Sequence, residues 1–172
     1  MILIGLGANM PHPDYGDPLN TLTEVVCRLR KILCVTHQSS WYRSAPVPMS
    51  DQPWFVNAVL AIETEMSENE LLQTLHKTER DFGRIRRDRW EARVLDLDLL
   101  AYHDRVTENQ VQKVGPVLPH PYMQERAFVL APIDEIAPKW RHPVSGFLAS
   151  ELLERLPSGQ AFDVIGVEDK SR

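Results

Sequence analysis

Two aspartates stand two residues apart in the stretch "RVLDLDLL", inside what otherwise reads as a buried strand. Alternate side chains of a strand point to opposite faces, so Asp96 and Asp98 share one face and the neighbouring leucines share the other. The two carboxylates then lie roughly 7 Å apart. Like charges this close repel unless water or a cation separates them, and Mg²⁺ typically takes one or two carboxylates plus water and substrate phosphates. The alternative is a strand with one solvated face and no metal.

An arginine-rich stretch leads directly into this strand. It has no lysine and contains Arg80, Arg84, Arg86, Arg87, Arg89 and Arg93. A guanidinium binds phosphate oxygens bidentately and keeps its charge, whereas a surface shaped only by solubility mixes in lysine. Cations beside a carboxylate strand favour metal-assisted phosphoryl transfer. The alternative is a solvated loop whose arginines pair with Asp81, Asp88 and Glu91.

Known glycine motifs do not account for phosphate binding in this chain. The pattern GxxxxGK[ST] is absent, and "GLGAN" lacks the third glycine of GxGxxG. The sequence therefore does not predict a P-loop enzyme, and it gives only weak support for a dinucleotide site.

Phe55 and Asn57 share one face of a predicted strand. An aromatic ring beside an amide that both donates and accepts suits a flat heteroaromatic ligand with an amide-like edge. Taken alone, such a phenylalanine is more often an ordinary core residue than a ligand contact, and a histidine such as His120 is more often an ordinary turn residue. Arg126 and Phe128 can likewise be the exposed and buried faces of one helix.

The elements that position these residues are predicted from periodicity and capping signals. A helix over 18–33 begins with Asp17 as N-cap and Pro18 in its first turn, and a second helix begins with the capping box of Ser67 and Glu70. The stretch 45–53 holds three prolines and predicts a loop. The other predicted ranges are strands over 2–7, 35–43, 55–64 and 94–102, and the second helix over 67–83.

This order of strand, helix, two strands, helix and strand predicts an α+β fold, the ferredoxin-like βαββαβ antiparallel sheet with helices on one face. The other face is left for a site. From about residue 104 the periodicity is weak, with helical stretches over 123–138 and 146–156. We expect a C-terminal extension that covers part of the sheet, one domain over 1–172, and a disordered tail over 166–172.

The composition of the chain favours some classes of protein and argues against others. The chain has 172 residues, 43% hydrophobic and 25% charged, which is typical of one globular domain. A formal net charge of −5 argues against nonspecific nucleic-acid binding, which needs an excess of Lys and Arg. No membrane span or signal peptide is indicated, so we expect a cytoplasmic monomer. Cys27 and Cys34 are expected to be reduced, partly buried thiols that form neither a disulfide nor a zinc site.

Taken together, these motifs resemble the 6-hydroxymethyl-7,8-dihydropterin pyrophosphokinase family of folate biosynthesis. The resemblance runs from "GLGAN" through "WYRSAPVPMSDQPWFVNAV" and "FGRIRRDRWEARVLDLDLL" to "LPHPYMQERAFVLAPIDEIAP", roughly residues 3 to 138. It implies a ferredoxin-like fold and an ATP-dependent diphosphotransferase. It also implies that Asp96 and Asp98 hold two Mg²⁺ ions, with ATP as co-substrate, and that Arg84 and Arg93 neutralise charge on the transferred diphosphate.

The resemblance also assigns the binding residues. Pterin contacts fall on Ser44, Ala45, Val47, Phe55, Asn57, Trp90 and Phe128. Nucleotide contacts fall on Glu79, Arg84, Arg86, Arg93, His120 and Arg126.

The sequence departs from the family pattern near both loops. Glu91 and Ala92 replace the usual Gly-Pro before Arg93, which changes the flexibility of the loop that would close over the site. Phe55 stands where some relatives have tyrosine. Near the nucleotide end, the departures are Gly115, Val117 and Pro121.

The chemistry implied is attack of the pterin hydroxyl on the β-phosphorus of ATP with release of AMP. Two other hypotheses stay open at this point. A catalytically silent RNA-binding module has no use for two aspartates that repel phosphate, and a nucleotidyl transferase releases pyrophosphate in place of AMP.

Overall fold

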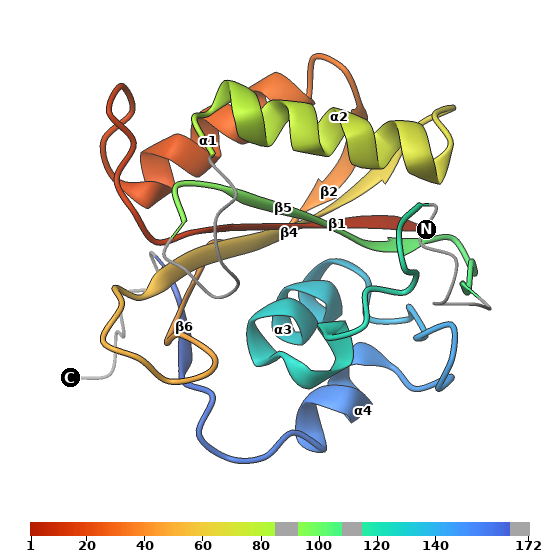
Figure 1. Cartoon of the computed structure of the whole chain (residues 1–172). Helices are drawn as coiled ribbons and strands as arrows, with labels where there is room; N and C mark the ends of the chain where they lie inside the picture. The colour runs from red at the N-terminus through yellow and green to blue at the C-terminus, as the bar shows by residue number, and fades with distance from the viewer. Residues whose placement is uncertain (85–92, 108–114, 166–172) are drawn as a thin grey trace.

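A six-stranded antiparallel sheet is the centre of the computed structural model (Figure 1), which describes residues 1–84, 93–107 and 115–165. Its strands are β1 Ile2–Ala8, β2 Cys34–Gln38, β3 Tyr42–Ser44, β4 Phe55–Glu63, β5 Asp96–Tyr102 and β6 Phe162–Val164. Their order is β5-β1-β4-β3-β6, and β2 also pairs with β4. Strand β1 is therefore an inner strand, between the strand that carries the aspartates and the strand that carries Phe55 and Asn57.

Two helices, α1 Pro18–Leu29 and α2 Glu68–Asp81, cover one face of the sheet (Figure 1). Both predicted caps are confirmed: Asp17 accepts from the backbone N–H of Asn20 at 2.9 Å, and Ser67 and Glu70 form the capping box. The first helix is shorter than the predicted range of 18–33. It ends at Leu29 because the chain turns back there to enter β2, although Leu33 remains buried in the same core.

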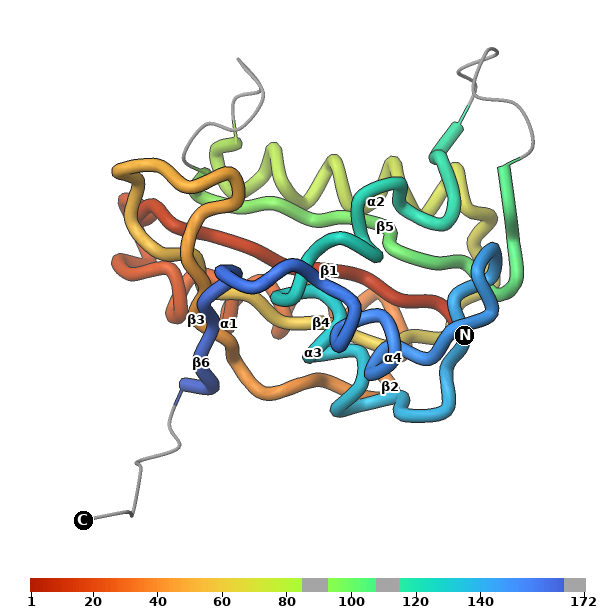
Figure 2. The backbone as a smooth tube through the Cα atoms, turned by 90° about the horizontal axis from the view of Figure 1, so that it is seen from below, coloured from red at the N-terminus to blue at the C-terminus, as the bar shows by residue number. Residues whose placement is uncertain are grey.

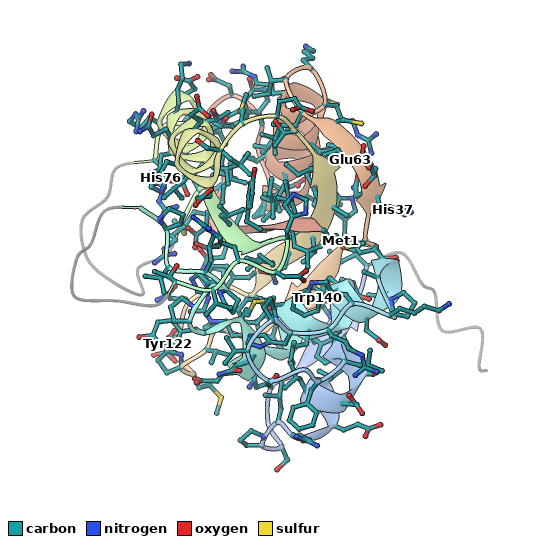
Figure 3. The ribbon with its side chains drawn as sticks, turned by 90° about the vertical axis from the view of Figure 1, so that its right-hand side faces the viewer. Met1, His37, Glu63, His76, Tyr122 and Trp140 are labelled. Carbon is teal, nitrogen blue, oxygen red and sulfur yellow. The ribbon has the colours of Figure 1, made fainter. Side chains whose placement is uncertain are left out.

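The opposite face carries the C-terminal elements. The helices α3 Ala127–Ile136 and α4 Ala149–Glu154 follow the 3₁₀ turn Met123–Glu125 and pack on a second apolar cluster that includes Leu3, Val59 and Leu100. Seen from this side (Figure 2), they cover one end of the sheet, and the loop between β3 and β4 lies at the other end. Side chains fill both layers (Figure 3), with His76 on the α2 side and Trp140 on the α3 side. None of the helices in the described ranges is long and apolar enough to cross a membrane.

Three further details differ from what the sequence predicted. The extended piece 35–43 is two strands, because Ser39 is buried between them, donates its backbone N–H to Val59 O and accepts from Val59 N through its hydroxyl, both at 3.0 Å. The strand β6 was not predicted; it is three residues long and pairs only with the short edge strand β3. Cys27 and Cys34 are free but exposed, not partly buried. The expected disorder of the tail 166–172 concerns residues outside the described ranges.

The carboxylate of Glu135 ties α3 to the sheet. It accepts from the Tyr42 hydroxyl at 2.8 Å and from the backbone N–H and hydroxyl of Ser40 at 2.9 and 2.8 Å. Burial and the nearby Glu135 carboxylate both raise the pKa of the Tyr42 phenol, so the hydroxyl remains a donor at neutral pH. This contact fixes the helix whose first turn carries Phe128.

We predict that Tyr42→Phe lowers the free energy of unfolding by about 1–2 kcal/mol, because the carboxylate loses one donor and keeps the others. Urea denaturation at neutral pH measures this loss. In a Glu135→Ala background the same substitution should cost much less, and equal losses in both backgrounds would show that the contact is not stabilising.

Candidate active site

Asp96 and Asp98 face a pocket on the α3 side of the sheet. Leu95, Leu97 and Leu99 point the other way into the core under α1 and α2, as the alternation predicted. The leucines thus pack β5 against the core on the opposite face of the sheet. The two carboxylates are held on a rigid strand, facing a space that a ligand can enter.

Five segments of the chain line the pocket. Strand β1 contributes Gly5 and Gly7, and the loop between β3 and β4 contributes the run 45–48 together with Ser50 and Gln52. Strand β4 contributes Phe55, Asn57 and Val59, strand β5 contributes Asp96, Asp98 and Leu100, and the start of α3 contributes Arg126, Phe128 and Val129. The carboxylates lie across strand β1 from the aromatic ring and the amide.

Asp96 is paired with two arginines. Arg84 donates to one of its oxygens and Arg93 to the other. Arg84 also donates to Glu79, which is buried and accepts the backbone N–H of Leu97 at 2.8 Å. Glu79 therefore links α2, β5 and Arg84 and holds one guanidinium at the edge of the pocket.

The negative charge of Asp98 is less fully compensated by nearby positive charge. Burial and the charge of Asp96 raise the pKa of its carboxyl to about 7, and Arg126 and Arg93 offset only part of this. The imidazole Nε2 of His120 lies 4.0 Å from its Oδ1, but burial and Arg126 lower the pKa of His120 to about 4. His120 is therefore neutral at pH 7 and supplies no positive charge.

A divalent cation fits this carboxylate pair. The oxygens are hard ligands of the kind that Mg²⁺ prefers, and a cation would relieve the repulsion between the two carboxylates that raises the pKa of Asp98. Within the described ranges, no group of three or more His, Cys, Asp or Glu side chains is placed to hold a metal ion. A cation bound by Asp96 and Asp98 would take its remaining ligands from water or from a substrate, which is the usual arrangement for Mg²⁺ with phosphates.

The structure brings most of the sequence-predicted site residues together. Those that line the pocket are Ala45, Val47, Phe55, Asn57, Arg93, Asp96, Asp98, Arg126 and Phe128. Ser44, Arg84, Glu79 and His120 lie behind or beside it, in contact with or close to lining residues. Arg86 and Trp90 fall outside the described ranges, as do Glu91 and Ala92.

Sequence reasoning missed Asn9, which joins two walls of the pocket. Its buried amide donates to Gln52 Oε1 at 3.2 Å and to Pro53 O at 3.1 Å, and accepts the backbone N–H of Arg93 at 2.7 Å. The backbone N–H groups of Asn9 and Met10 also donate to Arg93 O. The available signal was an asparagine directly after an apolar strand, but its partners are 43 to 84 residues away in sequence.

We predict that Asn9→Ala lowers the free energy of unfolding by about 1–3 kcal/mol, because it leaves the backbone N–H of Arg93 and the carbonyl of Pro53, both in part-buried hydrogen bonds, without their partner. The exposed Asn20, whose amide contacts only its own helix cap Asp17, gives the control Asn20→Ala, with an expected loss of about 0.5 kcal/mol. Both values come from urea denaturation. Similar small losses for the two variants would contradict the role given to Asn9.

We further predict that Asp98→Asn stabilises the metal-free protein at alkaline pH. Because the pKa of Asp98 is raised on folding, its ionisation costs stability as the pH rises from about 4 through about 7. A shift of this size is worth about 4 kcal/mol for a fully desolvated group. The side chain is 36% exposed, so the expected gain at pH 8 is about 1–2 kcal/mol.

Urea denaturation with EDTA at pH 8 and at pH 4 measures this difference. The difference should be much smaller at pH 4, close to the ordinary pKa of 3.8, because little of the cost of ionising Asp98 in the folded chain is present until the pH rises well above that value. A variant that is less stable than the wild type at pH 8 would contradict the unfavourable burial of this charge.

Known proteins with similar sequences agree on one family. The sequence profile of the 7,8-dihydro-6-hydroxymethylpterin-pyrophosphokinase family matches residues 3–138. A 2-amino-4-hydroxy-6-hydroxymethyldihydropteridine pyrophosphokinase of Synechocystis is 40% identical over 156 residues, covering 90% of this chain and 75% of its own. A protein of the same name from Methylorubrum extorquens is 40% identical over 159 residues, covering 91% and 94%.

The fold is also similar to a solved structure. The crystal structure of Plasmodium falciparum HPPK-DHPS with pteroate matches with a TM-score of 0.63 at 11% identity, over 89% of this chain. This chain spans 41% of the length of that larger protein. Because the family profile matches residues 3–138 and the two relatives are 40% identical, this chain belongs to the 7,8-dihydro-6-hydroxymethylpterin-pyrophosphokinase family.

Proposed function

We propose that this chain transfers diphosphate from ATP to the hydroxymethyl group of 6-hydroxymethyl-7,8-dihydropterin, releases AMP, and serves folate biosynthesis. The observation that carries the proposal is one pocket that places an aromatic and amide wall opposite a carboxylate pair flanked by arginines. The first wall suits a flat heterocycle, and the second suits a metal-bound polyphosphate.

The ring end would hold the pterin between Phe55 and Phe128. Both rings are half-buried at the pocket, one on β4 and the other at the start of α3. A flat ring placed between two aromatic faces gains stacking interactions and is removed from water. Asn57, buried at the floor, offers a donor and an acceptor to the ring edge.

The phosphate end would hold ATP with arginines. Arg84 and Arg93 are already at the carboxylates, and Arg126 lines the same pocket. Their guanidinium groups would bind phosphate oxygens and stabilise charge that develops on the transferred diphosphate. Because Arg84 and Arg93 bind Asp96 in this structure, cation binding by Asp96 would free their donors for the phosphates.

Asp96 and Asp98 would hold Mg²⁺, for which we propose two ions. Magnesium bound there would screen the phosphates and lower the pKa of the pterin hydroxyl. The hydroxyl oxygen forms a bond to the β-phosphorus while the bond from that phosphorus to the bridging oxygen of AMP breaks, and the hydroxyl proton is released to solvent. The side chains orient both reactants and exclude water that would otherwise hydrolyse ATP.

The test is to incubate the protein with ATP, Mg²⁺ and 6-hydroxymethyl-7,8-dihydropterin and to quantify AMP and the pterin diphosphate. We expect equimolar AMP and pterin diphosphate, and a fall in rate of about a hundredfold or more in Asp96→Asn, since the variant loses a cation ligand. Asp104→Asn, an exposed carboxylate in the turn after β5, is the matched control and should leave the rate unchanged.

Two results would overturn the proposal. Release of pyrophosphate in place of AMP would assign nucleotidyl transfer, and ATP turnover that is independent of the pterin would remove the ring from the reaction.

A further inference from the structure

The side chain of Gln160 holds the backbone at the start of helix α3. Its amide oxygen accepts the backbone N–H of Ala127 at 2.9 Å, and its amide nitrogen donates to Glu125 O at 2.8 Å. The first N–H groups of a helix have no partner within the helix. The N-cap residue here is Arg126, which is not one of the residue types that usually cap a helix with their own side chains. A residue 33 positions further along the chain therefore supplies this cap.

The segment that carries Gln160 is itself fixed to the edge of the sheet. The next residue, Ala161, accepts the backbone N–H of Ala45 at 3.0 Å. Phe162 then begins β6, which lies beside β3 (Figure 2) and pairs there with Ser44. This segment thus links two walls of the pocket, the start of α3 and the start of the loop between β3 and β4.

The two groups that Gln160 binds lie on either side of Arg126. Arg126 lines the pocket, and its Cζ lies 5.5 Å from the centre of the Tyr122 ring and 5.7 Å from that of the Phe128 ring. Both distances are within the range of a cation–π interaction. Among the described residues, Gln160 is not one of those that line the pocket. Any effect of its side chain on a ligand is therefore transmitted through the backbone at the start of α3.

We propose that Gln160 is a positioning residue that fixes the backbone on both sides of Arg126 and thereby holds the Arg126 guanidinium at the phosphate end of the pocket. A hydrogen bond on each side restrains the peptide units next to the arginine, and the two rings restrain its side chain. The cation then needs less reorganisation when a polyphosphate binds. This inference rests on the proposed function, because the ligand of Arg126 in it is the triphosphate of ATP.

The test is a double-mutant cycle between Gln160 and Arg126. Gln160→Met keeps the length of the side chain and removes both hydrogen bonds, and Arg126→Ala removes the cation. The quantities measured are kcat/KM for ATP at saturating pterin and the Kd of ATP, with Tm as a check on folding. Gln38→Met is the matched control, because Gln38 is also half-buried and accepts a side-chain hydrogen bond, from Arg30 at 3.1 Å, on strand β2 outside the pocket lining.

We expect Gln160→Met to lower kcat/KM for ATP about tenfold, because a displaced cation stabilises the charge on the transferred diphosphate less well. In the Arg126→Ala background the same substitution should change kcat/KM by less than about twofold, since no guanidinium is left to misplace. The Kd of ATP should show the same pattern, and it remains measurable if Arg126→Ala is inactive. Gln38→Met should stay within about twofold of the wild type.

A milder variant, Gln160→Glu, keeps the test valid should Gln160→Met fail to fold. It keeps an acceptor for the helix N–H, where a carboxylate is favoured, and loses only the donor to the carbonyl of Glu125. Its expected loss in kcat/KM is about threefold, and this loss should likewise disappear in the Arg126→Ala background.

Two results would overturn this inference alone: equal losses from the Gln160 substitution in the wild-type and Arg126→Ala backgrounds, or no loss in the wild-type background. A wild type that does not convert ATP and the pterin to AMP and the pterin diphosphate would overturn the proposed function, and this inference with it.

Discussion

Two carboxylates on one face of one strand impose the main electrostatic constraint on this protein. Asp96 and Asp98 cannot both ionise at low cost in a partly buried pocket unless positive charge is close. The chain satisfies Asp96 with Arg84 and Arg93, but it leaves Asp98 beside a neutral histidine with its pKa raised to about 7. In the function that we propose, a cation bound at this carboxylate would supply the missing positive charge and would in turn attract phosphate oxygens.

The rest of the fold keeps this pair in place. The leucines of β5 bury the back of the strand under α2, and Glu79 on α2 accepts a β5 backbone N–H and holds Arg84. Strand β1 lies between the carboxylates and Asn57, and because its Gly5 and Gly7 have no side chains, they leave space in the pocket there. The C-terminal helices cover the far end of the same face and supply Arg126 and Phe128. Contacts on both faces of the sheet therefore hold the residues of this one pocket in place.

Short-range sequence signals correctly predicted the elements that depend on residues close together in the chain. The alternation in "VLDLDLL" gave the face of each aspartate, and the caps at Asp17 and Ser67 gave the starts of two helices. The split between β2 and β3 and the strand β6 were missed because they depend on contacts between distant segments and carry no periodicity of their own. Asn9 was missed for the same reason, since an asparagine after a strand looks like a turn residue until Gln52 and Arg93 are placed around it. The assignment of individual binding residues came from the family resemblance and stays a prediction for all of them, and Arg86 and Trp90 also lie outside the described ranges.

The most direct measurement of the central claim is the titration of the Asp98 side-chain carboxyl by ¹³C NMR, with the resonance assigned from the Asp98→Asn spectrum. Without divalent cations the account predicts a pKa near 7, because burial and Asp96 oppose ionisation. With saturating Mg²⁺ the same carboxyl should be ionised well below pH 5. A pKa near the ordinary 3.8 without cations, together with no response to Mg²⁺, would contradict the account.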